Sequence, residues 1–295
     1  MLLEMAAFLG TTFYLRDLRV ASPQLDVESL RARLLEMVNE ERLIAKVPPV
    51  ATDDLAARVA MDHAVDMARG EFASHWGRDG SKPYHRYSFT GGIDATAENI
   101  SSADNNWLWR KKDLAQDVAY MHLRLYEETP PYDGHRRAIL SPHHTHVGFG
   151  LAVEDLRLRV VELFVARFVQ ISPIQRRVKA GSSFELSGRL IHPEHVLHGI
   201  EVFYEPLPQP PGIDWLRSSG PYSLPSVSVL LRPKLPGNMR YHDGVPGVID
   251  WDGRNFRTAV KLFKEEPGIY TIGCWVRKTR AEPAFIATHI CVRAQ

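Results

Sequence analysis

Residues 134–150, with the sequence GHRRAILSPHHTHVGFG, join a histidine-bearing helical turn directly to a β-strand. The first seven residues can form one turn of helix, and residues 146–153 have the apolar pattern of a strand. A second strand is expected over residues 157–167, after a tight acidic turn. The two strands therefore predict a hairpin that follows the helical turn carrying His135.

Three amphipathic helices are predicted upstream of this hairpin. The first begins after Asp26 and ends before Pro48, the second ends at Gly70, and the third covers residues 113–128. Helices in series followed by a hairpin indicate a layered α/β or α+β domain. Residues 72–106 are rich in Gly, Ser, Asp and His and show little periodicity, so they are expected to form a long functional loop.

The pattern changes after Ser172, where helical periodicity disappears. Short alternating runs then occur at residues 183–190, 200–204, 227–231, 256–263, 270–277 and 285–292. Proline and glycine clusters separate these runs, which is typical of a β-sandwich, and residues 267–271 resemble a late strand of an immunoglobulin-like module. We predict an N-terminal segment at 1–25, an α/β domain at 26–170 and an all-β, immunoglobulin-like sandwich domain at 171–295.

Length and charge narrow the classes of function. A chain of 295 residues is long enough for two domains, and its formal net charge of +1 gives no general attraction to nucleic acid. No apolar stretch approaches the roughly 18 residues that a transmembrane segment needs. Residues 1–15 are as apolar as a signal peptide, but Glu4 replaces the expected basic residue and no A-x-A cleavage site follows, so a signal peptide is not established.

The cysteines, Cys274 and Cys291, do not form a metal-binding CxxC motif. If residues 281–284 form the turn of a hairpin, the two thiols lie directly opposite each other. A disulfide and a pair of buried thiols are then equal alternatives.

Histidines and glutamates that can form one polar site are spread over the first half. His75 follows the second helix, Glu98 follows a Gly-Gly pair, and His135 follows the third helix, which ends in Glu127 and Glu128. Neutral imidazoles are common zinc ligands, and a nearby carboxylate can hold an imidazole, orient water or act as a base. Each residue also has a simpler interpretation, in which it only stabilises its loop or helix start.

The order of several motifs is more specific than their spacing. The motifs are Asn39-Glu40-Glu41-Arg42, residues 60–68, Phe72-Ala73-Ser74-His75, Ala97-Glu98-Asn99-Ile100, residues 134–140 and His146-Val147-Gly148-Phe149-Gly150. In this order they resemble the CAP superfamily, which comprises cysteine-rich secretory, antigen 5 and pathogenesis-related 1 (SCP-like) proteins. The sequence Gly134-His135-Arg136-Arg137-Ala138 and the lack of framework cysteines are closer to bacterial members than to animal or plant ones.

The resemblance implies an α-β-α sandwich with a cleft formed by His75, Glu98, a glutamate at the end of the third helix, and His135. It also implies that the two histidines bind Zn²⁺ or another divalent metal. Glu127 and Glu128 are about 100° apart on a helix, so only one of them can face the cleft, and we favour Glu128 because it is nearer to the turn that leads to His135.

Two functions from different classes are expected, the first favoured by the resemblance and the second by the residue types in the cleft. The first is an extracellular or cell-surface binding module, whose partner is a small ligand such as a lipid, a peptide or a cell-wall glycan. The second is a peptidase-like, metal-dependent hydrolase in which Glu98 or Glu128 is the catalytic base. A third interpretation is a structural surface protein with a vestigial cleft.

Overall fold

Alternation along strand β4 (Arg157–Ala166) determines which helices cover each face of the first sheet. Its even-numbered apolar residues pack with helices α1 (Val27–Ile44) and α4 (Lys111–Tyr126), whereas its odd-numbered ones pack with α2 (Asp54–Gly70).

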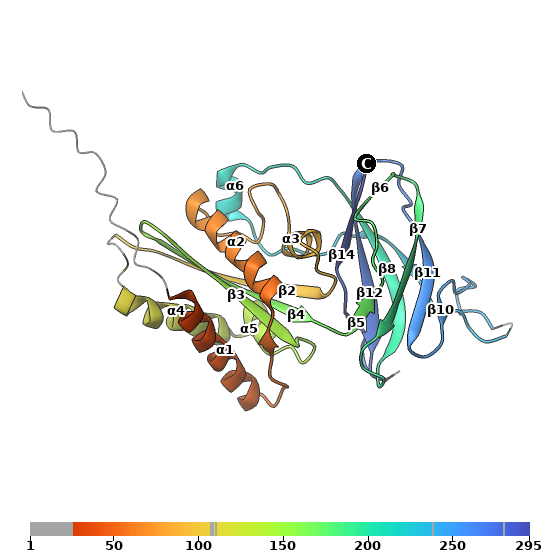
Figure 1. The fold of residues 1–295 in the computed structure, drawn as a ribbon, viewed down its shortest axis with the longest axis horizontal. Helices are drawn as coiled ribbons and strands as arrows, with labels where there is room; N and C mark the ends of the chain where they lie inside the picture. The colour runs from red at the N-terminus through yellow and green to blue at the C-terminus, as the bar shows by residue number, and fades with distance from the viewer. Residues whose placement is uncertain (1–25, 107–108, 110, 238, 280) are drawn as a thin grey trace, which may run out of the picture.

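The computed structural model describes residues 26–106, 109, 111–237, 239–279 and 281–295. The N-terminal segment and the signal-peptide question lie outside these residues. Within them, helices cover both faces of the sheet, as Figure 1 shows.

The first sheet has four strands in the order β1-β3-β4-β2, so β2 is an edge strand. Strand β1 pairs with β3 in parallel, and the other neighbours are antiparallel. The remaining elements of this half are β1 (Ala51–Thr52), α3 (Pro83–Phe89), β2 (Ala95–Asp104), α5 (Gly134–Ile139) and β3 (His146–Glu154). The predicted hairpin is therefore present as β3 and β4.

Helix α2 crosses very close to strand β3. The strand presents Gly148 and Gly150 to the helix, and a Cβ atom at either glycine would collide with the backbone of Ala57 or Ala60. Asp53 fixes the start of this helix, because its side chain accepts a hydrogen bond from the backbone N–H of Ala56 at 2.6 Å. This close packing fixes the position of α2, which carries His63 toward the site.

The expectation of a long loop over residues 72–106 was wrong for two segments. Helix α3 lies between residues 83 and 89, and β2 pairs with β4 along its whole length. Strand β2 was missed because its sequence, ATAENISSAD, lacks the apolar alternation of a typical strand. As an edge strand it needs fewer apolar side chains, and several of its polar ones belong to the site.

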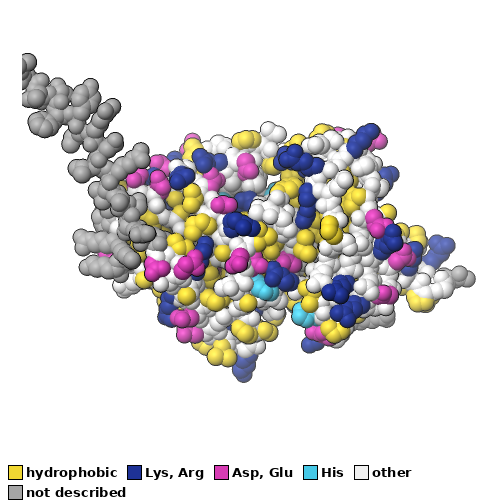
Figure 2. All heavy atoms as spheres, viewed as in Figure 1, with side chains coloured by type: hydrophobic (Ala, Val, Ile, Leu, Met, Phe, Trp, Pro, Cys, Tyr) yellow, Lys and Arg dark blue, Asp and Glu magenta, His cyan; other side chains and the backbone are white. Residues whose placement is uncertain are grey.

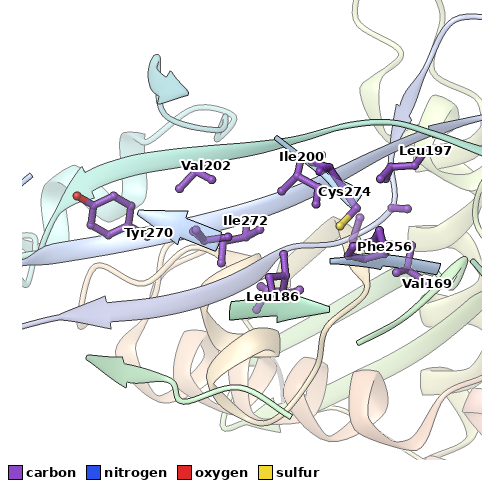
Figure 3. Packing of buried hydrophobic residues seen from close by; sticks show 14 of the residues in the cluster. Val169, Leu186, Leu197, Ile200, Val202, Phe256, Tyr270, Ile272 and Cys274 are labelled. Carbon is purple, nitrogen blue, oxygen red and sulfur yellow. The ribbon is translucent and has the colours of Figure 1, made fainter. Parts of the chain in front are cut away.

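The C-terminal half contains two sheets, with strand orders β10-β11-β7-β5 and β6-β14-β12-β8-β9, and β13 pairs with β12. Their bounds are β5 (Val169–Ile171), β6 (Arg177–Val178), β7 (Ser183–Leu190), β8 (Val196–Pro206), β9 (Val227–Leu231), β10 (Asp250–Trp251), β11 (Asn255–Lys261), β12 (Gly268–Arg277), β13 (Phe285–Ile286) and β14 (Ile290–Ala294). Figure 3 shows Leu186 of β7 and Phe256 of β11 packed with Ile200 of β8 and Ile272 of β12. The immunoglobulin-like topology stays a prediction.

Two details of this half differ from the sequence-based expectations. A short helix, α6 (Ile213–Ser218), interrupts the all-β pattern between β8 and β9. The hairpin register places Thr271 opposite Cys291, so Cys274 and Cys291 do not face each other, and both are buried free thiols. The register differs because the chain between β12 and β14 is longer than the assumed four-residue turn and includes β13.

The surface seen in Figure 2 mixes acidic and basic side chains without a broad patch of either sign. This distribution is consistent with the small formal net charge of the chain. No helix among the described residues is both long and apolar enough to span a membrane.

Candidate functional site

Glu98, on β2, is the most buried of the predicted site residues. Its Oε1 lies 2.9 Å from Nδ1 of His75, and its Oε2 accepts a hydrogen bond from Arg86 at 2.7 Å. Burial alone would raise the pKa of Glu98, but the positive charge of Arg86 and the neighbouring His63 and His75 lower it to about 2. Glu98 is therefore a carboxylate at neutral pH, with both oxygens engaged.

Arg86 also connects the carboxylate to the loop that carries His75. It donates hydrogen bonds to the backbone carbonyls of His75 and Ser81, each at 2.9 Å. The sequence did not single out Arg86, because it lies in α3, within the segment predicted as a loop. A basic residue shortly before the Ala-Glu-Asn-Ile motif was the only available signal.

His63 lies beneath Glu98 and has a structural role. Its Nε2 is 2.8 Å from the carbonyl of Ser74, so this nitrogen carries the proton and donates. Burial, with Arg86 nearby, lowers the pKa of His63 to about 4. The ring is therefore neutral at physiological pH.

His135 and Glu128 form the second histidine–carboxylate pair. Oε1 of Glu128 lies 2.5 Å from Nδ1 of His135, and Oε2 accepts the backbone N–H of the same residue at 3.0 Å. Glu128 lines the cleft, whereas the neighbouring Glu127 is exposed and is not among the lining residues. The favoured glutamate is thus the one that contacts His135.

The structure brings all four predicted residues to one cleft of about 680 Å³. The rings of His75 and His135 have their centroids 6.5 Å apart, at an interplanar angle of 31°. Each Nδ1 is held by a glutamate, and neither Nε2 has a hydrogen-bond partner among the described residues. The other lining residues are Ala73, Ser74, Ala97, Asn99, Ile100, Ser102, Tyr132, Gly134, Ala138, Ser219, Gly220, Pro221 and Tyr222.

A buried polar network lies between the sheet and helices α1 and α4 and reaches the cleft through Asn99. His122, on α4, lies between Glu162 at 2.5 Å and Glu41 at 3.1 Å. Asn99 donates to Glu162 at 3.1 Å and to the carbonyl of His135 at 3.2 Å, which links the network to the cleft. The sequence did not reveal this network, although a histidine on the apolar face of a helix needs a buried partner.

The charge state of His122 follows from its two carboxylate neighbours. Burial would lower its pKa, but the negative charge of Glu162 and the hydrogen bonds to Glu162 and Glu41 raise it to about 10. His122 is therefore an imidazolium at neutral pH, held between two carboxyl groups.

His75 and His135 are the cleft residues that could hold a metal ion. Among the described residues, no group of three or more His, Cys, Asp or Glu side chains is arranged to hold a metal ion. The rings of His75 and His135, with centroids 6.5 Å apart, could offer one nitrogen each to an ion in the cleft. Glu98 and Glu128 occupy the opposite nitrogens, as carboxylates commonly do beside metal-bound histidines.

Comparisons with known proteins agree with this description of the first half. Residues 35–166 match the family model described as the cysteine-rich secretory protein family, CAP. Residues 35–166 therefore form a CAP domain, and the resemblance seen in the sequence is confirmed for this part of the chain. No curated protein matches the chain.

Several solved structures match about half of this chain. An outer surface protein from Borrelia burgdorferi is 19% identical with a TM-score of 0.40, covering 48% of this chain and 96% of its own. An extracellular protein containing a SCP domain from Bacillus anthracis is 21% identical with a TM-score of 0.35, covering 48% of this chain and 41% of its own. The CAP domain of Enterococcal PrgA is 14% identical with a TM-score of 0.34, covering 47% of this chain and 60% of its own.

Proposed function

We propose that this chain is an extracellular or cell-surface binding protein whose CAP cleft holds a divalent metal, with zinc the first choice, between His75 and His135. A small ligand would bind beside the metal. The observation that carries the proposal is the pair of histidine–glutamate contacts, at 2.9 Å for His75 and 2.5 Å for His135. Each glutamate fixes a ring through Nδ1 and leaves Nε2 available to the cleft.

The energetics of such contacts support a metal-binding role. A carboxylate that accepts the Nδ1–H of a histidine fixes the tautomer and raises the basicity of the other nitrogen. The bound metal would supply a Lewis-acidic position for an oxygen or nitrogen of the ligand. Two protein nitrogens leave coordination positions for that ligand, because zinc commonly has four ligands.

The geometry supports binding better than hydrolysis. A general base works best when its pKa is near the working pH, but the pKa of Glu98 is lowered to about 2 and both of its oxygens are engaged. Both oxygens of Glu128 are also engaged, by the backbone and the ring of His135. The alternative of a hydrolase therefore lacks an available base among the two candidates.

The size and lining of the cleft agree with a small ligand. Its volume of about 680 Å³ lies in the usual range for small-molecule sites. Small apolar residues such as Ala73 and Ala97 alternate with serines and the His/Glu pairs. A lipid headgroup, a peptide or a glycan are the ligand classes we propose, and the location outside the cell rests on the CAP domain itself.

Zinc binding by the purified full chain tests the proposal. We expect calorimetry to give one zinc ion per wild-type chain, and the double variant His75→Ala, His135→Ala to lose at least tenfold in affinity. His198→Ala is the matched control, since His198 is an exposed histidine on β8, and it should bind zinc as the wild type does. Zinc affinity that is unchanged in the double variant would contradict the metal site.

A further inference from the structure

A segment of the C-terminal half leaves its own sheets and packs on the CAP domain. Helix α6 lies beside α2 in Figure 1, away from the strands on either side of it in sequence. Its Leu216 is 1% exposed and belongs to the same apolar cluster as residues of α2 and β4. Trp215 packs edge-to-face on Trp76, with ring centroids 5.3 Å apart. These contacts anchor the connection between β8 and β9 next to the cleft.

The same segment then forms one wall of the cleft. Ser219, Gly220, Pro221 and Tyr222 are all lining residues, and the hydroxyls of Ser219 and Ser74 are 2.5 Å apart. The ring of Tyr222 packs edge-to-face against His75 at a centroid distance of 5.0 Å. The Tyr222 hydroxyl accepts a hydrogen bond from the backbone N–H of Glu98 at 3.2 Å. One side chain of the second half therefore contacts two residues of the proposed site.

The hydrogen bond to Glu98 has a clear structural reason. Strand β2 is the edge of its sheet, so alternate backbone N–H groups on its outer side have no neighbouring strand to accept them. Thr96 and Glu98 are two residues apart and donate on this side. The C-terminal half supplies both acceptors: Nδ1 of His289 for Thr96 at 3.1 Å, and the Tyr222 hydroxyl for Glu98.

We propose that Tyr222 is a positioning residue of the cleft, which holds the Glu98 backbone through its hydroxyl and the His75 ring through its own ring. The C-terminal half is then part of the binding site. This inference rests on the proposed function for its effect on metal affinity, but the positioning of Glu98 is independent of any metal.

Two substitutions separate the hydroxyl from the ring. Tyr222→Phe removes only the acceptor, so the Glu98 amide should exchange its hydrogen at least several-fold faster. Tyr222→Ala removes the ring as well and should lower zinc affinity by about tenfold, as loss of a supporting contact to a metal ligand commonly does. Tyr241→Ala is the control, since Tyr241 bonds to Pro233, outside the cleft lining, and should change neither quantity.

Amide exchange followed by NMR and zinc calorimetry give independent answers. Unchanged exchange at Glu98 in the phenylalanine variant would overturn the inference. If Tyr222→Ala fails to fold, amide exchange in Tyr222→Phe still tests the inference. If the wild type binds no zinc, the proposed function fails, whereas faster exchange at Glu98 in Tyr222→Phe would still support the positioning role of Tyr222.

Discussion

Oε1 of Glu98 lies 2.9 Å from Nδ1 of His75, while the other oxygen of the same carboxylate is bound by Arg86. The carboxylate is therefore fixed on one side by a permanent charge and on the other by a histidine whose Nε2 has no hydrogen-bond partner among the described residues. Because Glu98 is 6% exposed, little water is available to replace either partner. The contact between Glu98 and Arg86 therefore stabilises the CAP domain, and the contact between Glu98 and His75 orients the His75 ring.

Replacing Arg86 should destabilise the protein strongly. In Arg86→Gln the buried carboxylate of Glu98 loses its charge partner, and the free energy of unfolding should fall by about 3–5 kcal/mol. Arg78→Gln is the matched control, because Arg78 pairs with Asp66 at the surface and should cost about 1 kcal/mol or less. Urea unfolding measures both, and equal losses would contradict the role given to Arg86.

His122 should make stability depend on alkaline pH. The pKa of His122 is raised from 6.5 to about 10 in the folded protein, so its contribution is fully present below pH 6.5 and is lost as the pH rises through about 10. His122→Gln should therefore destabilise by about 3–5 kcal/mol at pH 6, where two buried carboxyl groups lose their cation. The difference from the wild type should shrink toward pH 10.

Urea unfolding of wild type and His122→Gln at pH 6, 8 and 10 measures this dependence. His242→Gln removes an exposed histidine instead and should leave the pH profile nearly unchanged. A difference between His122→Gln and the wild type that stays constant or grows with pH would show that His122 is not a buried cation.

The two adjacent glutamates, which lie just after α4 and not on it as predicted, offer a sharp test of orientation. Glu128→Gln weakens the contact to Nδ1 of His135 and should lower zinc affinity by roughly 10- to 100-fold. Glu127→Gln makes the same chemical change on an exposed neighbour and should alter affinity by less than about twofold. Calorimetry on the two variants distinguishes them, and equal affinities would mean that Glu128 does not support a metal ligand.

Periodicity predicted the elements that bury an apolar face. The three helices and the hairpin of β3 and β4 appeared in the sequence because their apolar residues repeat at helical or strand spacing. Strand β2 and helix α3 were not predicted, because they carry polar residues that contact each other, such as Glu98 on β2 and Arg86 on α3. The order of the CAP-like motifs along the chain, and not the spacing of the residues, predicted that His75, Glu98 and His135 form one site.

The parts of the site that could not be predicted depend on contacts between distant segments. Tyr222 is separated by 124 residues from Glu98, and His122 by 81 from Glu41. Neither tyrosine nor histidine carries a local pattern that identifies such a partner. Tyr222 and His122 are identified only by the folded structure, which brings each of them into contact with its distant partner.

The most direct test of the metal site is anomalous scattering at the zinc edge from crystals of the full chain grown with zinc. We predict one strong peak in the cleft within bonding distance, about 2.0–2.1 Å, of Nε2 of both His75 and His135. Absence of a peak there, or a peak only at histidines outside the cleft, would contradict the account.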